Sequence, residues 1–326
     1  MAHVVTVFGG SGFIGRTLIK RLAKTGAVIR VPVRNPELAK VLKPMGDVGQ
    51  ITPFRIDIGS DAAVADAVAD ADAVVNLIGI LHERGRHRFE AVQGQAPGRM
   101  AAAAARAGAK HFVQVSAIGA DAASPSAYAR TKAQGEAAVR AAFPGAVILR
   151  PSIVFGPEDD FFNRFATLAQ VAPALPLIGG GHTKFQPVYV GDVADAIMTA
   201  LDDPATAGKT YELGGPQVCS FAELMRLMLD QIQRKRWLVS VPFGLAGLQA
   251  LLLELVSPPL VALGTLAGPP LTRDQVKLLK HDSVVSPGVL TLRDLGIAPT
   301  ALAAILPTYL DRFRPGGRFA RPSPAR

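Results

Sequence analysis

Short apolar runs rich in β-branched residues recur through the first half of the chain. They lie at residues 3–8, 27–33, 51–56, 73–78, 111–116 and 146–151. Between them are alanine- and charge-rich stretches of helical length, such as residues 99–108 and 133–143. Strands that alternate with helices in this way predict an α/β fold built on a doubly wound parallel sheet.

The alternation loosens after Pro151, where Gly and Pro punctuate the chain. Residues 185–201, FQPVYVGDVADAIMTAL, predict one more strand and helix, which we expect to return to the first domain. The resulting division is a Rossmann-type domain over 1–155 with 185–202 returning to it, a smaller C-terminal lobe over most of 156–311, and a tail over 312–326.

Residues 237–266 are almost wholly apolar, but Pro242, Glu254 and the Pro258–Pro259 pair interrupt them. The longest unbroken helical piece, about residues 244–256, is shorter than the roughly 20 residues that a membrane span needs. A helix that is apolar nearly all round must be covered by a lobe, a partner or a membrane interface. The pattern leaves an ordinary buried helix and an interfacial helix equally open.

Length and composition limit the classes of fold and function that this chain can have. A 326-residue chain with 49% hydrophobic residues can bury a large core and a second lobe. Its single cysteine, Cys219, excludes an intramolecular disulfide framework and fits a reducing compartment. The N-terminus runs straight into a strand, so we expect no export.

More than half of the net charge of +9 lies in the tail, which holds five arginines and no acid. Neither a nucleic-acid module nor a metal-ligand spacing is apparent, so we expect no nucleic-acid partner and no metal.

A glycine pattern follows the first strand. In VTVFGGSGFIGRTLIKRL, glycines at 9, 12 and 15 separate a strand from a helix. Gly9 allows the tight turn, Gly12 lets the backbone approach a pyrophosphate, and Gly15 lets helix and strand pack closely. Because the N–H groups of the helix N-terminus face the anion, this pattern predicts a dinucleotide-binding loop.

The end of the second strand indicates which dinucleotide binds. An NAD-binding protein would carry an acidic residue there for the ribose 2′-hydroxyl, whereas this chain has Arg34. An arginine favours a 2′-phosphate, and Arg16 can reach the same group. The expected cofactor is therefore NADPH. Asp57, at the end of the third strand, is assigned either to the adenine or to capping its own loop.

Tyr128 and Lys132 stand four residues apart in a stretch predicted to be helical, so both project from one face. With Ser116, GGSGFIG, NLIG at 76–79, YARTK and LRPSIVFGP, they resemble the extended and atypical members of the short-chain dehydrogenase/reductase superfamily. The resemblance implies that the Tyr128 hydroxyl exchanges a proton with a substrate. It also implies that the Lys132 ammonium binds the nicotinamide ribose and lowers the pKa of the tyrosine, while Ser116 holds the substrate oxygen.

A closer likeness extends almost to residue 310. The stretches RPSIVFGPEDDFFNRFA, TKFQPVYVGDVADAI, YELGGP and PPLTRDQVKLLKHDSVV resemble the NADPH-binding accessory subunits of respiratory complex I in their bacterial form. This likeness implies a non-catalytic subunit that holds its nucleotide tightly, with other complex I subunits and the membrane surface as partners. The apolar stretch 237–266 and the basic residues flanking it suggest a peripheral location on the cytoplasmic face of a bacterial inner membrane.

Two functions remain open at this point. The first is the accessory subunit, in which no residue is catalytic. The alternative is a freestanding NADPH-dependent reductase or epimerase that uses Ser116, Tyr128 and Lys132. In either case the expected cofactor-binding residues are Gly9, Ser11, Gly12, Phe13, Ile14, Gly15, Arg16, Arg34, Asp57, Ile58, Leu77, Ile78, Gly79, Ser116, Tyr128, Lys132, Pro151 and Ile153.

Overall fold

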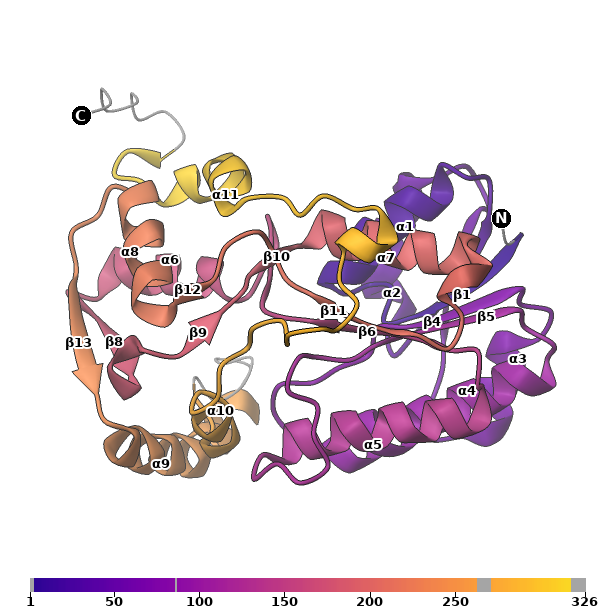
Figure 1. Cartoon of the computed structure of the whole chain (residues 1–326), viewed down its shortest axis with the longest axis horizontal. Coiled ribbons are helices and arrows are strands. Elements are labelled where there is room, and N and C mark those ends of the chain that lie inside the picture. Colours follow the sequence, from indigo (N-terminus) through magenta and orange to yellow (C-terminus); the bar gives the residue numbers. More distant parts are fainter. Residues whose placement is uncertain (1–2, 86, 263–270, 318–326) are drawn as a thin grey trace. The chain divides into compact units, whose positions relative to one another are not determined.

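The computed structural model describes residues 3–85, 87–262 and 271–317, with side chains at all of these except 255–262. The chain divides into two compact units. Unit 1 comprises residues up to Pro151, Val190–Leu213 and Val285–Ala298. Unit 2 comprises Ser152–Tyr189, Gly214–Val284 and the residues from Pro299 onward. Figure 1 labels the elements of both.

Unit 1 is built on a seven-stranded sheet in the order β11-β6-β5-β4-β1-β2-β3. Every pairing in it is parallel. The strands are β1 (Val4–Phe8), β2 (Val28–Val33), β3 (Ile51–Arg55), β4 (Ala73–Asn76), β5 (His111–Val115), β6 (Val147–Pro151) and β11 (Thr210–Leu213). The predicted fold class is confirmed, because six apolar runs became six neighbouring strands. The seventh, β11, was not predicted.

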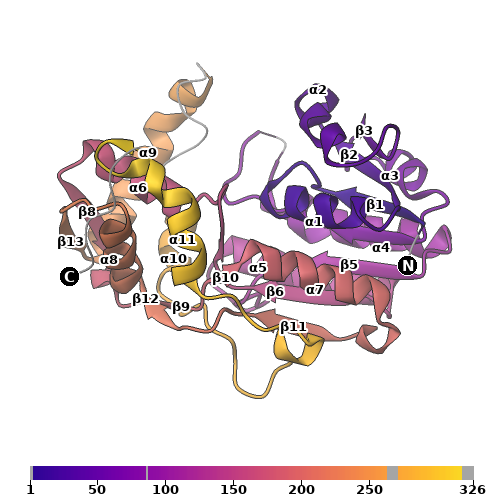
Figure 2. The same cartoon turned by 90° about the horizontal axis from the view of Figure 1, so that it is seen from above.

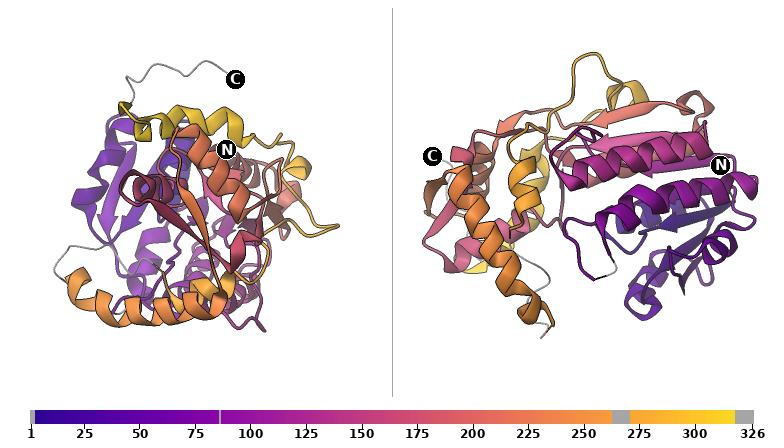
Figure 3. Two further views of the ribbon diagram at one scale, coloured as in Figure 1. Left: turned by 90° about the vertical axis from the view of Figure 1, so that its left-hand side faces the viewer. Right: turned by 90° about the horizontal axis from the view of Figure 1, so that it is seen from below.

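Helices cover both faces of this sheet (Figures 1 and 2). On one face lie α3 (Asp61–Val68), α4 (Ala96–Arg106) and α5 (Ala127–Ala142), with α4 and α5 side by side in Figure 3. On the other face α1 (Phe13–Ala23) packs along α7 (Val190–Asp202). In α1, Leu18, Ile19 and Leu22 are buried, at the spacing of one helical face. The remaining elements are α2 (Pro36–Ala39), η1 (Lys40–Met45), the π-helix η2 (Glu90–Gln95), η4 (Pro204–Thr206) and η5 (Arg293–Leu295).

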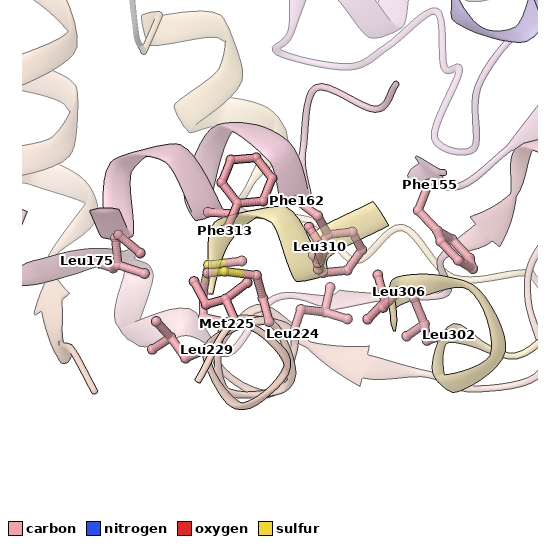
Figure 4. Close-up of a cluster of buried hydrophobic side chains, with 14 of the residues drawn as sticks. Phe155, Phe162, Leu175, Leu224, Met225, Leu229, Leu302, Leu306, Leu310 and Phe313 are labelled. Atoms are coloured by element: carbon pink, nitrogen blue, oxygen red, sulfur yellow. The ribbon is translucent and has the colours of Figure 1, made fainter. Parts of the chain in front are cut away.

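Unit 2 has a separate apolar core formed by three helices and the strand β8 (Ala174–Ile178). The helices are α6 (Phe162–Val171), α8 (Phe221–Gln231) and α11 (Leu302–Leu310), and Figure 4 shows their side chains meeting. Aromatic and aliphatic residues such as Phe155, Phe162 and Leu310 are fully buried there. The other elements are β7 (Val154–Phe155), η3 (Gly179–Gly181), β9 (Lys184–Phe185), β10 (Val188–Tyr189), β12 (Cys219–Ser220), β13 (Trp237–Val241), α9 (Phe243–Ala262), α10 (Arg273–Leu278) and η6 (Asp311–Phe313).

The apolar segment of unit 2 differs from the sequence prediction. Helix α9 is longer than the expected piece, because it continues through the Pro258–Pro259 pair instead of ending before it. Each proline removes one backbone donor, and the helix continues without those two hydrogen bonds. Among the described residues, no helix is both long and apolar enough to cross a membrane. Most of the predicted basic tail, from residue 318 onward, lies outside the described residues.

Candidate functional site

Most of the predicted site residues gather at one edge of the unit 1 sheet. Gly9 follows β1, Arg34 follows β2, Leu77 follows β4 and Ser116 follows β5. All these strands are parallel, so these positions share the carboxyl edge. The chain passes from β1 to β2 on one side and returns on the other side in β4. In open α/β sheets, ligands bind at this reversal of strand order.

The glycine loop makes a tight turn between β1 and α1. Gly9 has φ +76°, a left-handed conformation that side chains disfavour, and its carbonyl accepts the Gly12 N–H at 3.0 Å. A Cβ at Gly15 would lie 2.5 Å from the Gly10 carbonyl oxygen, so only glycine allows this approach. Gly12 is the N-cap of α1, and it leads into the half-buried Phe13 and Ile14. The loop therefore brings a helix N-terminus to the sheet edge, as an anion site requires.

The two arginines expected to bind a 2′-phosphate lie in different settings. Arg34 is exposed immediately beyond β2. Arg16 is half-buried in α1, where its Nε donates to the Ser11 carbonyl at 3.0 Å. Asp57 accepts the Gly59 N–H at 2.9 Å, a local turn that corresponds to the loop-capping alternative. Ile58, next to Asp57, is half-buried.

The segment after β4 approaches the predicted lysine. Leu77 donates its N–H to the Phe8 carbonyl at 2.9 Å, and the Ile78 N–H donates to Asn76 Oδ1 at 3.0 Å. A Cβ built on Gly79 would lie 3.3 Å from Lys132 Nζ. The NLIG stretch therefore lies next to the helix that carries Tyr128 and Lys132.

Helix α5 brings Tyr128 and Lys132 to the end of β5. Lys132 is buried, and its Nζ donates to the Val115 carbonyl at 3.4 Å, next to Ser116. The same ammonium lies 5.9 Å from the centroid of the Tyr128 ring. Tyr128 also packs edge-to-face on Phe89, with 6.0 Å between ring centroids.

Burial shifts the pKa values of the two α5 side chains in opposite directions. It raises the pKa of the Tyr128 phenol to about 12, because the phenolate would lose its solvation. It lowers the pKa of the Lys132 ammonium to about 8, and the nearby Glu136 carboxylate partly opposes that effect. At neutral pH Tyr128 is thus a neutral phenol and Lys132 is mostly charged.

Several residues around Lys132 were missed from the sequence. Gln93 belongs to the π-helix η2, and its Oε1 accepts the Ile80 N–H at 3.1 Å. Glu136 is buried one turn beyond Lys132 and forms a two-bond ion pair with Arg150 of β6. From the sequence, only the four-residue spacing of Lys132 and Glu136 could have pointed to a role for Glu136. Its ion-pair partner Arg150 comes from a strand distant in the sequence.

Two predicted residues, one at the end of β6 and one just beyond it, lie in different units. Pro151 ends β6 in unit 1, where its carbonyl accepts the Ile118 N–H at 3.0 Å. Ile153 belongs to unit 2, and its half-buried side chain packs against the unit 2 core. No group of His, Cys, Asp and Glu side chains that could hold a metal occurs in the described ranges.

The residues at the sheet edge fit a dinucleotide. Within the described part of the chain, Ser116 Oγ is buried without a hydrogen-bond partner, so it has a donor and an acceptor to offer. The Gly9–Gly15 loop suits a pyrophosphate, and the Lys132 ammonium suits ribose hydroxyls. A nicotinamide group, when bound, would supply hydride chemistry.

The fold and the glycine loop define a Rossmann-type α/β protein. The chain belongs to the NAD dependent epimerase/dehydratase family, whose model matches residues 5–214. Apart from Val4, the match covers the seven-stranded sheet, and it also covers the first part of unit 2.

Curated relatives match over nearly the whole chain. The chain is 39% identical to the Arabidopsis thaliana protein "NADH dehydrogenase [ubiquinone] 1 alpha subcomplex subunit 9, mitochondrial", over 96% of this chain and 79% of that protein. It is 32% identical to the Neurospora crassa "NADH-ubiquinone oxidoreductase 40 kDa subunit, mitochondrial", over 98% and 82%. A shorter match, 33% identical over 62% of each chain, is to the "Ceramide reductase" of Caulobacter vibrioides.

A solved structure supports the fold alone. The dTDP-glucose 4,6-dehydratase DesIV of Streptomyces venezuelae, with NAD and TYD bound, has a TM-score of 0.71 over 94% of this chain and 95% of that chain. Its sequence is only 21% identical.

Proposed function

We propose that this chain is a non-catalytic NADPH-binding accessory subunit of respiratory complex I that stabilises or assembles the complex near the membrane. One observation carries the proposal. The family model ends at residue 214, whereas the similarity to the two named complex I subunits continues through unit 2. Ile153 is the one expected nucleotide-binding residue that lies in unit 2, so a likeness that extends through the rest of unit 2 supports a shared partner.

The choice of NADPH over NADH is also a proposal. It is supported by Arg34, which stands exposed at the end of β2 where an NAD-binding protein carries an acid. The neighbouring Asn35 side chain caps α2 by accepting the Glu37 N–H at 3.0 Å. The first polar side chain beyond the strand is thus cationic, which suits a 2′-phosphate.

The absence of catalysis in this proposal is supported by the charge state of the α5 pair. A general acid works best when its pKa lies near the working pH, and burial instead raises the pKa of Tyr128 to about 12. The charged Lys132 can still donate hydrogen bonds to ribose hydroxyls. The pair therefore suits retention of a nucleotide better than proton transfer.

We propose a peripheral location on the cytoplasmic face of a bacterial inner membrane, with other complex I subunits as partners. Support comes from helix α9, where Leu245, Leu248 and Leu252 are 55–62% exposed at positions that share one helical face. Single exposed leucines are common, but three on one face indicate a contact surface.

The test is purification from native membranes under mild detergent. We expect complex I subunits to co-purify with the chain, and the released nucleotide to be NADP(H) by chromatography. An Arg34→Asp variant should lose about 1–3 kcal/mol of NADPH affinity, the contribution of charge-assisted bonds. Arg55→Asp, an exposed arginine at the end of β3, is the matched control. Recovery of the chain alone, or with NAD(H), would contradict the proposal.

A freestanding NADPH-dependent reductase or epimerase is the second candidate. Ser116, Tyr128 and Lys132 meet at the end of β5, and the chain is similar to a ceramide reductase over 62% of its length. This candidate predicts steady NADPH oxidation by the isolated protein with a carbonyl substrate, abolished by Tyr128→Phe. The accessory-subunit proposal instead predicts that Tyr128→Phe leaves nucleotide content and assembly near wild type.

A further inference from the structure

A cluster of four alternating charges lies behind the predicted nucleotide site. Lys132 and Glu136 come from α5, Arg150 from β6 and Glu212 from β11. Lys132, Glu136 and Glu212 are each at most 6% exposed. Two cations and two carboxylates make the cluster neutral only while Lys132 is protonated.

Glu136 is held firmly within this cluster. Arg150 Nε donates to Glu136 Oε1 at 2.9 Å, and its Nη2 donates to Oε2 at 2.7 Å. The Arg150 Nη1 lies 3.6 Å from Glu212 Oε1, and Glu212 Oε2 accepts the Ser286 N–H at 2.8 Å. A two-bond arginine–carboxylate pair fixes orientation as well as charge. The Glu136 carboxylate is thereby kept on the face of α5 that carries Lys132.

Two further charged groups packed near α5 have hydrogen-bond partners other than Lys132. Glu90 of η2 accepts Gln134 Nε2 at 2.7 Å, and Arg99 of α4 donates to the Ile58 carbonyl at 3.0 Å. Among the described residues, the Tyr128 phenol, the Val115 carbonyl and the Gln93 amide also lie near the ammonium, and they carry no charge at neutral pH. Glu136 is the carboxylate that opposes the effect of burial on the Lys132 pKa.

We propose that Glu136 is a positioning residue for the nucleotide site. Its carboxylate keeps the Lys132 ammonium charged at the carboxyl end of β5, and Arg150 holds that carboxylate in place. This inference rests on the proposed function, because it assumes that the Lys132 ammonium binds the nucleotide. Within a buried site, a carboxylate one helical turn away interacts more strongly than it would in water.

The experiment compares Glu136→Gln with Glu212→Gln in the full-length protein. Both variants remove one carboxylate from Arg150 with the same change of charge and shape, but only Glu136 neighbours Lys132 on α5. Two quantities are measured from pH 6 to 9.5. The first is the titration midpoint of the Lys132 side chain, followed by NMR of 13Cε-labelled lysine in nucleotide-free protein, with the Lys132 signal assigned by its loss in Lys132→Arg. The second is the Kd for NADPH, measured by fluorescence.

In wild type the NMR midpoint should lie near pH 8. Glu136→Gln should lower it by about one pH unit, and Glu212→Gln should leave it near the wild-type value. NADPH binding by Glu136→Gln should then equal wild type at pH 6, be about threefold weaker at pH 7.5, and approach tenfold weaker above pH 9. Adding Lys132→Arg to Glu136→Gln should remove this pH dependence, because arginine stays charged.

Three results would overturn the inference. They are an unchanged midpoint in Glu136→Gln, an equal shift in Glu212→Gln, or a loss of affinity by one factor at every pH. If Glu136→Gln does not fold, Glu136→Asp retains the charge for Arg150 but withdraws it by one methylene. Its midpoint should then fall by less than one unit, and an unchanged value would count against the inference. If wild type binds no dinucleotide, the proposed function fails, while the NMR midpoints still test Glu136 independently.

Discussion

The two units differ in what they bury. Unit 1 buries the charged side chains of Lys132, Glu136, Asp192 and Glu212, most of them near one edge of its sheet. In unit 2 Asp159 is the buried charge among the described residues, and the rest of the core is aromatic and aliphatic. Burying ions is costly unless they are paired. Glu136 and Glu212 pair with Arg150, whereas the Lys132 ammonium donates to the Val115 carbonyl, so its burial lowers the stability of unit 1 at the candidate site.

Unit 2 also carries a helix with an exposed apolar face. In α9 of unit 2 the small residues Ala246 and Ala250 are fully buried, while Leu245, Leu248 and Leu252 are more than half exposed. A helix that only had to pack would bury its leucines. Under the proposed function, unit 1 would bind a small polar ligand and unit 2 would contact a partner through an apolar face.

The largest expected effect concerns the unit 2 core. Phe162→Ala should lower the free energy of unfolding of that unit by about 3–5 kcal/mol, because Phe162 is fully buried. The single tryptophan, Trp237, lies in β13 of unit 2 and reports its unfolding in urea by fluorescence. The buried Phe112 of unit 1 provides the matched variant Phe112→Ala, which should leave the Trp237 transition unchanged. A common shift in both variants would mean that the units unfold together, and the comparison would fail.

The next effect is a gain in stability in unit 1. Lys132→Met keeps an unbranched apolar chain and removes the buried ammonium. Burial lowers the pKa of Lys132 from an ordinary value of 10.5 to about 8, which corresponds to about 3 kcal/mol. Because the unfolded chain holds this proton up to pH 10.5, the cost is present in full below pH 8 and disappears as pH rises toward 10.5. Nucleotide-free Lys132→Met should therefore unfold at higher urea than wild type at pH 7, with a much smaller difference at pH 10. Lower stability at pH 7 would show that the ammonium stabilises the fold.

The parts of unit 1 that were predictable rest on local pattern. Six strands could be read from the sequence as runs rich in β-branched residues, and the loop could be read from the regular spacing of glycines 9, 12 and 15. The strand β11 was missed, because TYEL at 210–213 is short and becomes a strand only by pairing with β6. The same limit applies to Arg150, whose partners Glu136 and Glu212 lie on elements far apart in the sequence.

Unit 2 was less predictable, and for a physical reason. Strand β8 carries Pro176, and β13 is mostly exposed, yet the two pair in parallel over five residues. Neither sequence, ALPLI or WLVSV, alternates apolar with polar residues, so pattern alone could not assign these strands. In α9 the apolar residues run all round the helix, and only the packing of Ala246 and Ala250 decides which face is exposed.

A smaller loss is expected at the buried charge of unit 2. The Tyr309 hydroxyl donates to Asp159 Oδ2 at 2.5 Å and joins α11 to the start of α6. Tyr309→Phe should cost about 2 kcal/mol in the Trp237 transition at pH 7, because a charged acceptor loses a donor. Burial raises the Asp159 pKa and the tyrosine bond lowers it, so the variant carboxyl should protonate more readily and the loss should shrink toward pH 4. A loss that does not depend on pH would point to packing of the ring instead.

The smallest effect on folding should accompany the clearest effect on attachment. Replacing Leu245, Leu248 and Leu252 together by serine removes apolar side chains that solvent already reaches, so each should change stability by no more than about 0.5 kcal/mol. If these leucines contact a membrane-bound partner, the triple variant should be lost from washed membranes and should no longer co-purify with other subunits, while its NADPH content stays near wild type. Leu38→Ser, at a residue of unit 1 that is 74% exposed, is the control and should remain attached. Salt should release little of the wild-type protein, because an apolar contact is not screened as an ionic contact is. Attachment of the triple variant at the wild-type level would contradict a docking role for this face of α9, since unit 2 would then dock through another face. A large loss of stability would show that these side chains support the fold itself.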